Sequence, residues 1–519
     1  MKISPYSLAA LAAVSLVPQA NAFSLLGSAD ASQISDIGYF ANGEGVRTYS
    51  QQGDVGGPRS IGGEFRCSTP VLTFGFDATF LDFFGTNGVI AVQNAIQILN
   101  DLRPASQMSA GLTEYPLRTS GVNFAAQRLH LLDLKSFTLS ILLEQLGLAA
   151  PERWIWSIKQ RFTINNVNNF LVFNRNFDPV SQNFSPFVNG TRYSFVIGSY
   201  TLPSGTVYYN TRKVAIDAAE PNITVSALNG VAAGEDGLDD RLLRVMRYNP
   251  GNLEGSAGGG AWGLYFSGLT RDDAGAVRYL LDPRNKNYES APTGSAAPSG
   301  AGVISVKASG NSGGSSGSTS GAWTVVDNSL TAGGGTGGTG GTTNVTTAVF
   351  QNESLRAGVD KITFVRVDLD PLTRRLARPL AVQYSEKVST NGVSFTQRVE
   401  RIIIQPDIVF SAADLGATQA VPFVYNRSVN FTQPARTAAD VINNPNNALA
   451  YPGNISGNVD VTFSSIGPHY LTGDVGSHQG DSDFGFLWGS FDGTTNRPVA
   501  FPEGRVDLIQ LEQAALKEK

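Results

Sequence analysis

The sequence predicts a β-rich α+β domain with two or three core helices, followed by an all-β sandwich. Helical periodicity is concentrated in the first half of the 519-residue chain, whereas alternation of apolar and polar residues dominates after residue 348. Between these parts, residues 289–347 are rich in Gly, Ser and Thr and hold too little apolar surface for a core. The expected division is a signal peptide at 1–22, an α+β domain at 23–288, a linker or decorated loop at 289–347, a β-sandwich at 348–502 and a tail at 503–519.

The first 22 residues have the composition of an export signal. Lys2 precedes an apolar run over residues 8–17, and Ala20-Asn21-Ala22 is the small-x-small pattern that signal peptidases cut. We therefore expect cleavage after Ala22 and a secreted, periplasmic or cell-surface protein. No later apolar run reaches the roughly 18 residues that a membrane helix needs, so no membrane span is expected in the mature chain.

Charge and cysteine content narrow the class of protein further. The net charge is -5 and no block of basic residues is present, which argues against a nucleic-acid partner. Cys67 is the only cysteine, so no intrachain disulfide can form and stability must come from packed cores. Its position at the start of a strand-like run favours a small buried apolar role over a nucleophile.

The most apolar stretch after the signal sequence, residues 133–151, predicts a buried helix. Leucines recur from Leu139 to Leu146 at the i, i+3, i+4, i+7 spacing of one helix face. Asp133 suits the N-cap, and Gly147 suits the left-handed residue that ends a helix.

Two further helices and a mainly β remainder are expected. Residues 89–102 show helical spacing after a Gly-containing break at 85–88, and residues 270–281 begin with a Thr cap and two aspartates. Hairpin turns are predicted at Asn189-Gly190 and Asn391-Gly392. Closely spaced strands without helices after residue 348 favour a sandwich, with an immunoglobulin-like arrangement as its most specific form.

Two short motifs resemble those of matrixin-type metzincins. Leu146-Gly147-Leu148 is similar to the glycine region of that family's zinc helix, and the Leu269 to Asp273 segment, LTRDD, is similar to its closing helix, in the same order. The resemblance implies a metalloprotease-like scaffold over roughly residues 69–281. Aligned through Gly147, however, the family's metal and catalytic positions fall on Ser140, Ile141, Glu144 and Ala150. Only Glu144 among these could bind a metal, so the zinc motif is missing.

One other segment gathers metal-binding residue types. Imidazole and carboxylate groups stand close together in a glycine-rich stretch, at His469, Asp474, His478, Asp481 and Asp483. The first interpretation is a long loop between strands. The alternative is a site for Ca²⁺ or another divalent ion, because these donors suit such cations. No other cofactor is expected.

The sequence favours a non-catalytic exported protein. The expected role is structural or binding, at the cell surface or in the extracellular matrix, with a protein or polysaccharide as partner. The alternative is a secreted hydrolase of extracellular protein or polysaccharide on the metalloprotease-like scaffold. Whether the chain is an enzyme stays open, although it has no intact zinc, serine or cysteine hydrolase motif.

Overall fold

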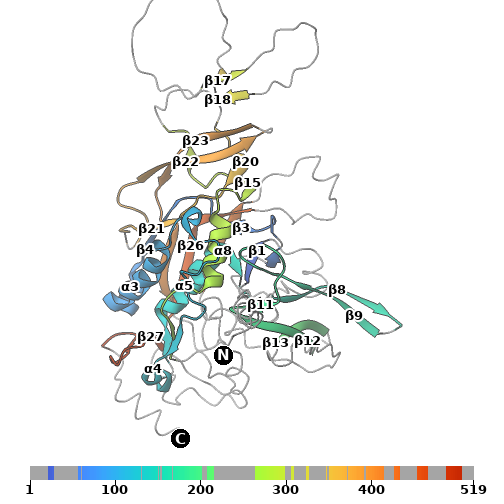
Figure 1. Cartoon of the computed structure of the whole chain (residues 1–519). Helices are drawn as coiled ribbons and strands as arrows, with labels where there is room; N and C mark the ends of the chain where they lie inside the picture. The colour runs from blue at the N-terminus through green and yellow to red at the C-terminus, as the bar shows by residue number, and fades with distance from the viewer. Residues whose placement is uncertain are drawn as a thin grey trace, which may run out of the picture.

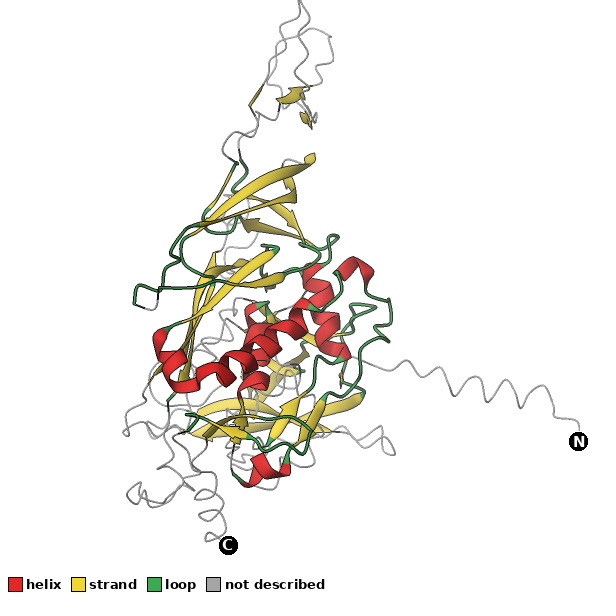
Figure 2. Ribbon diagram, turned by 90° about the vertical axis from the view of Figure 1, so that its left-hand side faces the viewer, coloured by secondary structure: helices red, strands yellow, loops and turns green. Residues whose placement is uncertain are grey.

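The structure is a computed structural model. The described residues are 22–27, 57–59, 61–129, 131–149, 151, 155–165, 167–201, 207–215, 263–298, 305–308, 323–325, 346–347, 350–370, 372–390, 393–413, 426–432, 453–465 and 487–504. They form a β-rich α+β fold in which the longer helices gather in the middle of the molecule with sheets around them (Figure 2). The β-rich α+β class is as predicted.

A six-stranded sheet forms the centre of the fold. Its order is β21-β4-β24-β26-β25, with β3 paired to β26. The strands are β3 (Phe65–Arg66), β4 (Val71–Phe76), β21 (Thr363–Arg366), β24 (Ile408–Ala413), β25 (Asn426–Thr432) and β26 (Gly453–Ser464). Strand β4 pairs in parallel with both β21 and β24, and β24 pairs in parallel with β26.

A five-stranded antiparallel sheet lies next to the central sheet (Figure 1). Its order is β15-β20-β22-β23-β16, with bounds Lys286–Ser290, Glu353–Ala357, Leu380–Thr390, Val393–Ile403 and Ser295–Ala296. Strands β22 and β23 pair along their whole length, up to Thr390 and Val393. The predicted turn residues Asn391 and Gly392 lie outside the described residues.

Smaller sheets complete the β structure. One contains β1 (Phe23–Gly27), β2 (Gly57–Arg59), β7 (Leu148–Ala149) and β10 (Asn176–Phe177), and another contains β6 (Leu131–Asp133), β27 (Leu487–Ser490) and β28 (Val499–Ala500). The remaining strands are β5 (Ser120–Val122), β8 (Trp156–Ile164), β9 (Val167–Asn174), β11 (Phe187–Val188), β12 (Thr191–Thr201), β13 (Val207–Ala215), β14 (Leu264–Phe266), β17 (Ser305–Ala308), β18 (Trp323–Val325) and β19 (Thr346–Thr347). Strands β11 and β12 flank the predicted Asn189-Gly190 turn, where both residues have positive φ.

The two halves of the chain share one core, which corrects the predicted division. Strands from residues 71–76 and from residues 363–413 are direct neighbours in the central sheet. One hydrophobic cluster includes Phe74 and Leu142 together with Phe410 and Phe463. The boundary between an α+β domain at 23–288 and a separate sandwich at 348–502 is therefore wrong. An immunoglobulin sandwich consists of antiparallel sheets, whereas β24 pairs in parallel on both sides.

The described helices are α3 (Ala78–Asn100), α4 (Phe124–Arg128), α5 (Leu134–Gln145) and α8 (Arg271–Leu281), with a 3-10 turn at Ala105–Gln107. The sequence predicted helices in the regions of α3, α5 and α8, but it did not predict α4. Asp133 caps α5 as expected, and Gly147 follows it at φ 103°, where Phe65 O leaves no room for a Cβ. The predicted break at 85–88 is instead a kink inside α3, because Gly85 adopts φ 56° and the helix begins earlier, at Ala78.

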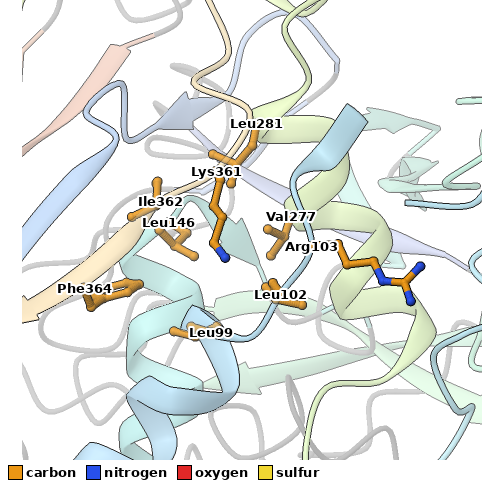
Figure 3. A pocket seen from close by; sticks show the side chains of 9 residues that line it. All are labelled: Leu99, Leu102, Arg103, Leu146, Val277, Leu281, Lys361, Ile362 and Phe364. Atoms are coloured by element: carbon orange, nitrogen blue, oxygen red, sulfur yellow. The ribbon is translucent and has the colours of Figure 1, made fainter. Parts of the chain in front are cut away.

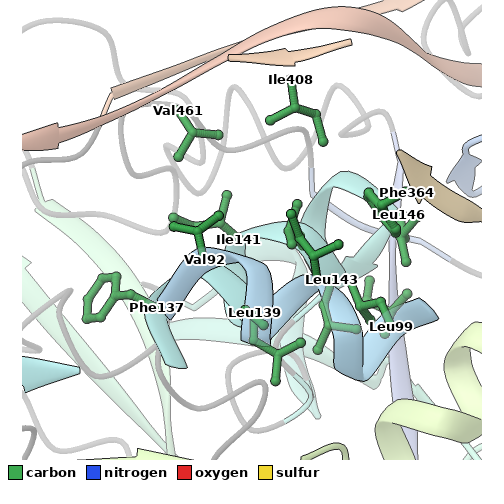
Figure 4. Packing of buried hydrophobic residues seen from close by; sticks show 14 of the residues in the cluster. Val92, Leu99, Phe137, Leu139, Ile141, Leu143, Leu146, Phe364, Ile408 and Val461 are labelled. Carbon is green, nitrogen blue, oxygen red and sulfur yellow. The ribbon is translucent and has the colours of Figure 1, made fainter. Parts of the chain in front are cut away.

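Helix α5 packs between α3 and the strands, and all of its residues except Lys135 are buried. Figure 4 shows Leu139, Ile141, Leu143 and Leu146 of this helix among side chains of α3 and the central sheet. Burial of each such side chain contributes about 1.5–3 kcal/mol to folding. Within the described residues, no helix is long and apolar enough to cross a membrane.

Candidate functional site

The residues predicted to bind a divalent ion lie outside the described part of the chain. His469, Asp474, His478, Asp481 and Asp483 all belong to residues 466–486, between the ends of β26 and β27. Within the described residues, no group of three or more His, Cys, Asp or Glu side chains could hold a metal ion. The divalent-ion site stays a prediction.

The positions that align with a zinc motif belong to the interior of the fold. Ser140, Ile141 and Glu144 are each at most 4% exposed on α5, and Ala150 lies outside the described residues. Glu144 thus does not face water. The described positions among the four are all buried.

A set of buried charged residues, here called the ion-pair network, lies where the five-stranded sheet meets β3, β4 and α8. Its first pair joins Arg66 Nε on β3 to Glu289 Oε1 on β15 at 2.6 Å, and both side chains are 0% exposed. The same guanidinium donates to the backbone oxygens of Asn285 at 2.8 Å and Arg356 at 2.6 Å. Arg66 therefore connects β3 to two strands of the neighbouring sheet.

The second pair runs across the five-stranded sheet. Arg356 Nη1 on β20 contacts Glu386 Oε1 on β22 at 2.8 Å, and both side chains are buried. Gln397 on β23 donates from Nε2 to the same carboxylate oxygen at 2.8 Å. Three adjacent strands are thus tied together on their inner face.

The third pair connects this sheet to the central one. Arg401 at the end of β23 donates two hydrogen bonds to the carboxylate of Asp407, which also accepts the backbone N–H of Thr73 at 2.8 Å and its hydroxyl at 2.9 Å. Because Thr73 lies on β4, the contact joins residues more than 300 positions apart in the sequence.

Glu64 adds a hydrogen-bonded junction to the same region. Its Oε1 accepts from Tyr279 Oη on α8 and from Asn287 Nδ2 on β15, each at 3.0 Å, and its Oε2 accepts from the N–H of Gly62 at 2.6 Å. A helix and a strand are thereby held on the segment that leads into β3.

Burial governs the protonation of these groups. It raises the pKa of Glu289 to about 7, although the neighbouring Arg66 acts in the opposite direction. It also raises the pKa of the Cys67 thiol to about 12, with the carboxylates of Asp407 and Glu289 adding to the effect. Cys67 is buried, as predicted, and as a neutral thiol it has little nucleophilic character.

The ion-pair network has the chemistry of a structural element. Its arginines contact carboxylates and backbone oxygens inside the protein, so these charges stabilise one arrangement of strands. Breaking a buried pair by removing one partner typically costs about 3–5 kcal/mol, because the other charge is left in a medium that solvates it poorly. Such pairs fix the register between layers, which apolar contacts alone leave open.

The carboxyl ends of the parallel strands are a second place to look, because open α/β sheets usually bind ligands there. Asp77 follows β4 and caps α3 by accepting from the N–H of Phe80 at 3.1 Å. Its other oxygen pairs with Arg374 at 2.6 Å, and Arg374 also reaches Asp460 at 3.3 Å. These charges position the helix and a loop at this edge.

One small apolar hollow lies between α3, α5, α8 and β21 (Figure 3). Leu99, Leu146, Val277 and Phe364 contribute to its walls, with Lys361 among them. It has a volume of about 10 Å³, which is close to the room that one water molecule needs. The hollow is therefore the size of a packing defect and is too small to be a ligand pocket.

No protein-family model, curated protein sequence or solved structure matches this chain. The resemblance to matrixin-type metzincins therefore stays a prediction that rests on two short motifs. Both motifs lie where helices were expected, since Gly147 follows α5 and Thr270 caps α8 in a capping box with Asp273.

Reasoning from the sequence missed the ion-pair network, although a local signal was present. The side chains of Ser354 and Arg356 on β20 are buried, whereas Leu355 between them is 41% exposed. Along β15, Asn287 and Glu289 are the inward residues. Charged residues at the alternating positions of a strand that face the core indicate that they have buried partners. They do not identify those partners.

Proposed function

We propose that this chain is an exported, non-catalytic protein with a structural or binding role at the cell surface or in the extracellular matrix. The observation that carries the proposal is the ion-pair network. These buried acids and bases hold strands and a helix in place, and the pairs Arg66–Glu289, Arg356–Glu386 and Arg401–Asp407 are all inside the protein. Catalytic acids and bases need access to a substrate.

The long β22–β23 hairpin supports the binding part of the proposal. On its outer face, Gln383, Lys387, Thr396 and Arg398 are exposed, while the alternate residues face inward. Gln383 Nε2 also donates to Glu400 Oε1 at 2.9 Å across the two strands. An exposed sheet face with amide, hydroxyl and cationic groups is suited to hydrogen bonding with a polysaccharide or an acidic protein surface. The internal ion pairs hold this face rigid.

Hydrolysis and binding assays test the proposal against the secreted hydrolase. The exported protein should release no product from casein, gelatin or common cell-wall polysaccharides, and should be retained on at least one immobilised polysaccharide or matrix protein. Retention should fall in the double variant Lys387→Ser, Arg398→Ser. It should stay unchanged in the double variant Arg103→Ser, Arg128→Ser, which removes the same number of positive charges from exposed positions elsewhere in the chain. Chelator-sensitive hydrolysis that disappears in Glu144→Gln would overturn the proposal in favour of the metalloprotease.

A further inference from the structure

The expected cleavage site coincides with the start of a buried strand. Phe23 is the first residue of β1 and is 0% exposed. Its ring stacks on Tyr279 of α8 with centroids 5.5 Å apart and meets Phe177 at 6.1 Å. Strand β1 pairs with β10, β2 and β7. It lies next to α8 (Figure 1). The residue that becomes the N-terminus is thus held in the core.

The backbone at this point meets a buried carboxylate. The N–H of Ala22 donates to Asp272 Oδ1 at 3.0 Å, and the N–H of Asn189 donates to Oδ2 at 2.8 Å. Ala22 and Asp272 are both 0% exposed. Asp272 stands in the first turn of α8, where the helix dipole favours negative charge.

We propose that removal of residues 1–22 is a maturation step that places the new α-ammonium group of Phe23 against Asp272 as a buried ion pair. The inference rests on the export proposed above. A signal peptidase adds water across the Ala22–Phe23 peptide bond: the hydroxyl goes to the Ala22 carbonyl carbon, and the released amine of Phe23 takes up a proton. An α-amino group has an ordinary pKa near 8, so it is mainly charged at neutral pH.

The geometry favours this exchange. Loss of Ala22 empties the space beside Asp272, and the Phe23 nitrogen lies only one residue, about 3.8 Å of chain, further along. A neutral N–H to carboxylate contact is replaced by a charge-assisted one, which is shorter and stronger. Because the Ala22–Phe23 bond lies in fully buried surroundings, cleavage must precede complete folding.

The test compares mature chains that differ only at the N-terminus. One form begins at Phe23, one carries an acetyl group on Phe23, and one is extended by Asn21-Ala22 and a short tag. The free Phe23 form should have a thermal midpoint several degrees above the other two. Asp272→Asn should abolish that difference, whereas Asp273→Asn, which removes the capping box of the same helix, should lower all midpoints and keep it.

The outcomes separate the ion pair from export. Equal midpoints for the free and acetylated forms, or a difference that survives Asp272→Asn, would overturn the ion pair while leaving export intact. N-terminal sequencing of exported protein that returned a residue other than Phe23 would overturn the maturation step itself. If Asp272→Asn fails to fold, the thermal midpoints of the free and acetylated Phe23 forms, with all side chains unchanged, still test whether the charged N-terminus stabilises the fold.

Discussion

Two junctions in this protein are built in opposite ways. Helices α3 and α5 meet the central sheet through apolar side chains, such as Leu142, Phe410 and Phe463, with Phe410 and Phe463 stacked at 6.5 Å. The five-stranded sheet meets the same central sheet through the ion-pair network. Apolar contacts are non-directional and supply most of the folding free energy, whereas buried ion pairs are directional and specify which strands meet.

The largest effect is expected in the ion-pair network. Arg66→Ala should lower the free energy of unfolding by about 3–5 kcal/mol, because the buried carboxyl group of Glu289 loses the guanidinium that pairs with it. Chemical denaturation measures this. The double variant Arg66→Met, Glu289→Leu removes both charges and should recover most of the loss. Equal stability of Arg66→Ala and the unmodified protein would show that the pair does not hold the junction.

The apolar junction should respond to the loss of volume alone. Leu142→Ala should lower the free energy of unfolding by about 2–5 kcal/mol, as large-to-small changes in cores do. Removing a charged residue as a second change should not restore the lost stability. Ile90→Ala on α3 is the control, because this side chain is 46% exposed and should change stability by about 0.5–1 kcal/mol at most. A similar loss for both variants would contradict the packing described here.

The pH dependence of stability should separate the two junctions further. Because the pKa of Glu289 is raised to about 7 in the folded protein, the folded state binds more protons at this carboxyl than the unfolded state does. Its contribution to stability therefore falls as pH rises from about 4.5 to 7. Relative to Glu289→Gln, the unmodified protein should become less stable across this window. If the unmodified protein instead became more stable than Glu289→Gln as the pH rises, the pKa of Glu289 would not be raised in the folded state.

The smallest effect is expected for the ion pairs of Arg374, whose own side chain is partly exposed. Arg374 is 40% exposed, and solvent screens its contacts with Asp77 and Asp460. Arg374→Ala should therefore cost about 1 kcal/mol or less, and the effect should shrink further at high salt. A loss as large as that of Arg66→Ala would mean that burial does not set the strength of these pairs.

The difference between the junctions also explains what the sequence could predict. Helix α5, the capping box at Thr270 and the Asn189-Gly190 turn were predictable because neighbouring residues determine them. The parallel pairing of β4 with β21 and β24 was not, because partners more than 280 residues apart leave no local pattern. The Gly-rich composition of 289–347 suggested a linker, yet residues 286–290 and 295–296 belong to a shared sheet.

The candidate site divides in the same way. Burial of Cys67 was predicted from its position at the start of a strand-like run. The partners of Arg66 did not follow from the sequence, since Glu289 and the Arg356 carbonyl come from strands that only the fold brings together. The predicted donors between His469 and Asp483 lie outside the described residues.

The central claim is that both halves of the chain form one core, and cutting the chain between them tests it most directly. A specific protease site inserted near residue 330, within the Gly-rich stretch, allows the folded protein to be nicked and then passed over a sizing column without denaturant. The shared sheet predicts that both fragments elute together at the size of the intact protein and separate only when unfolded. Two fragments that separate under native conditions, each still folded, would contradict the account.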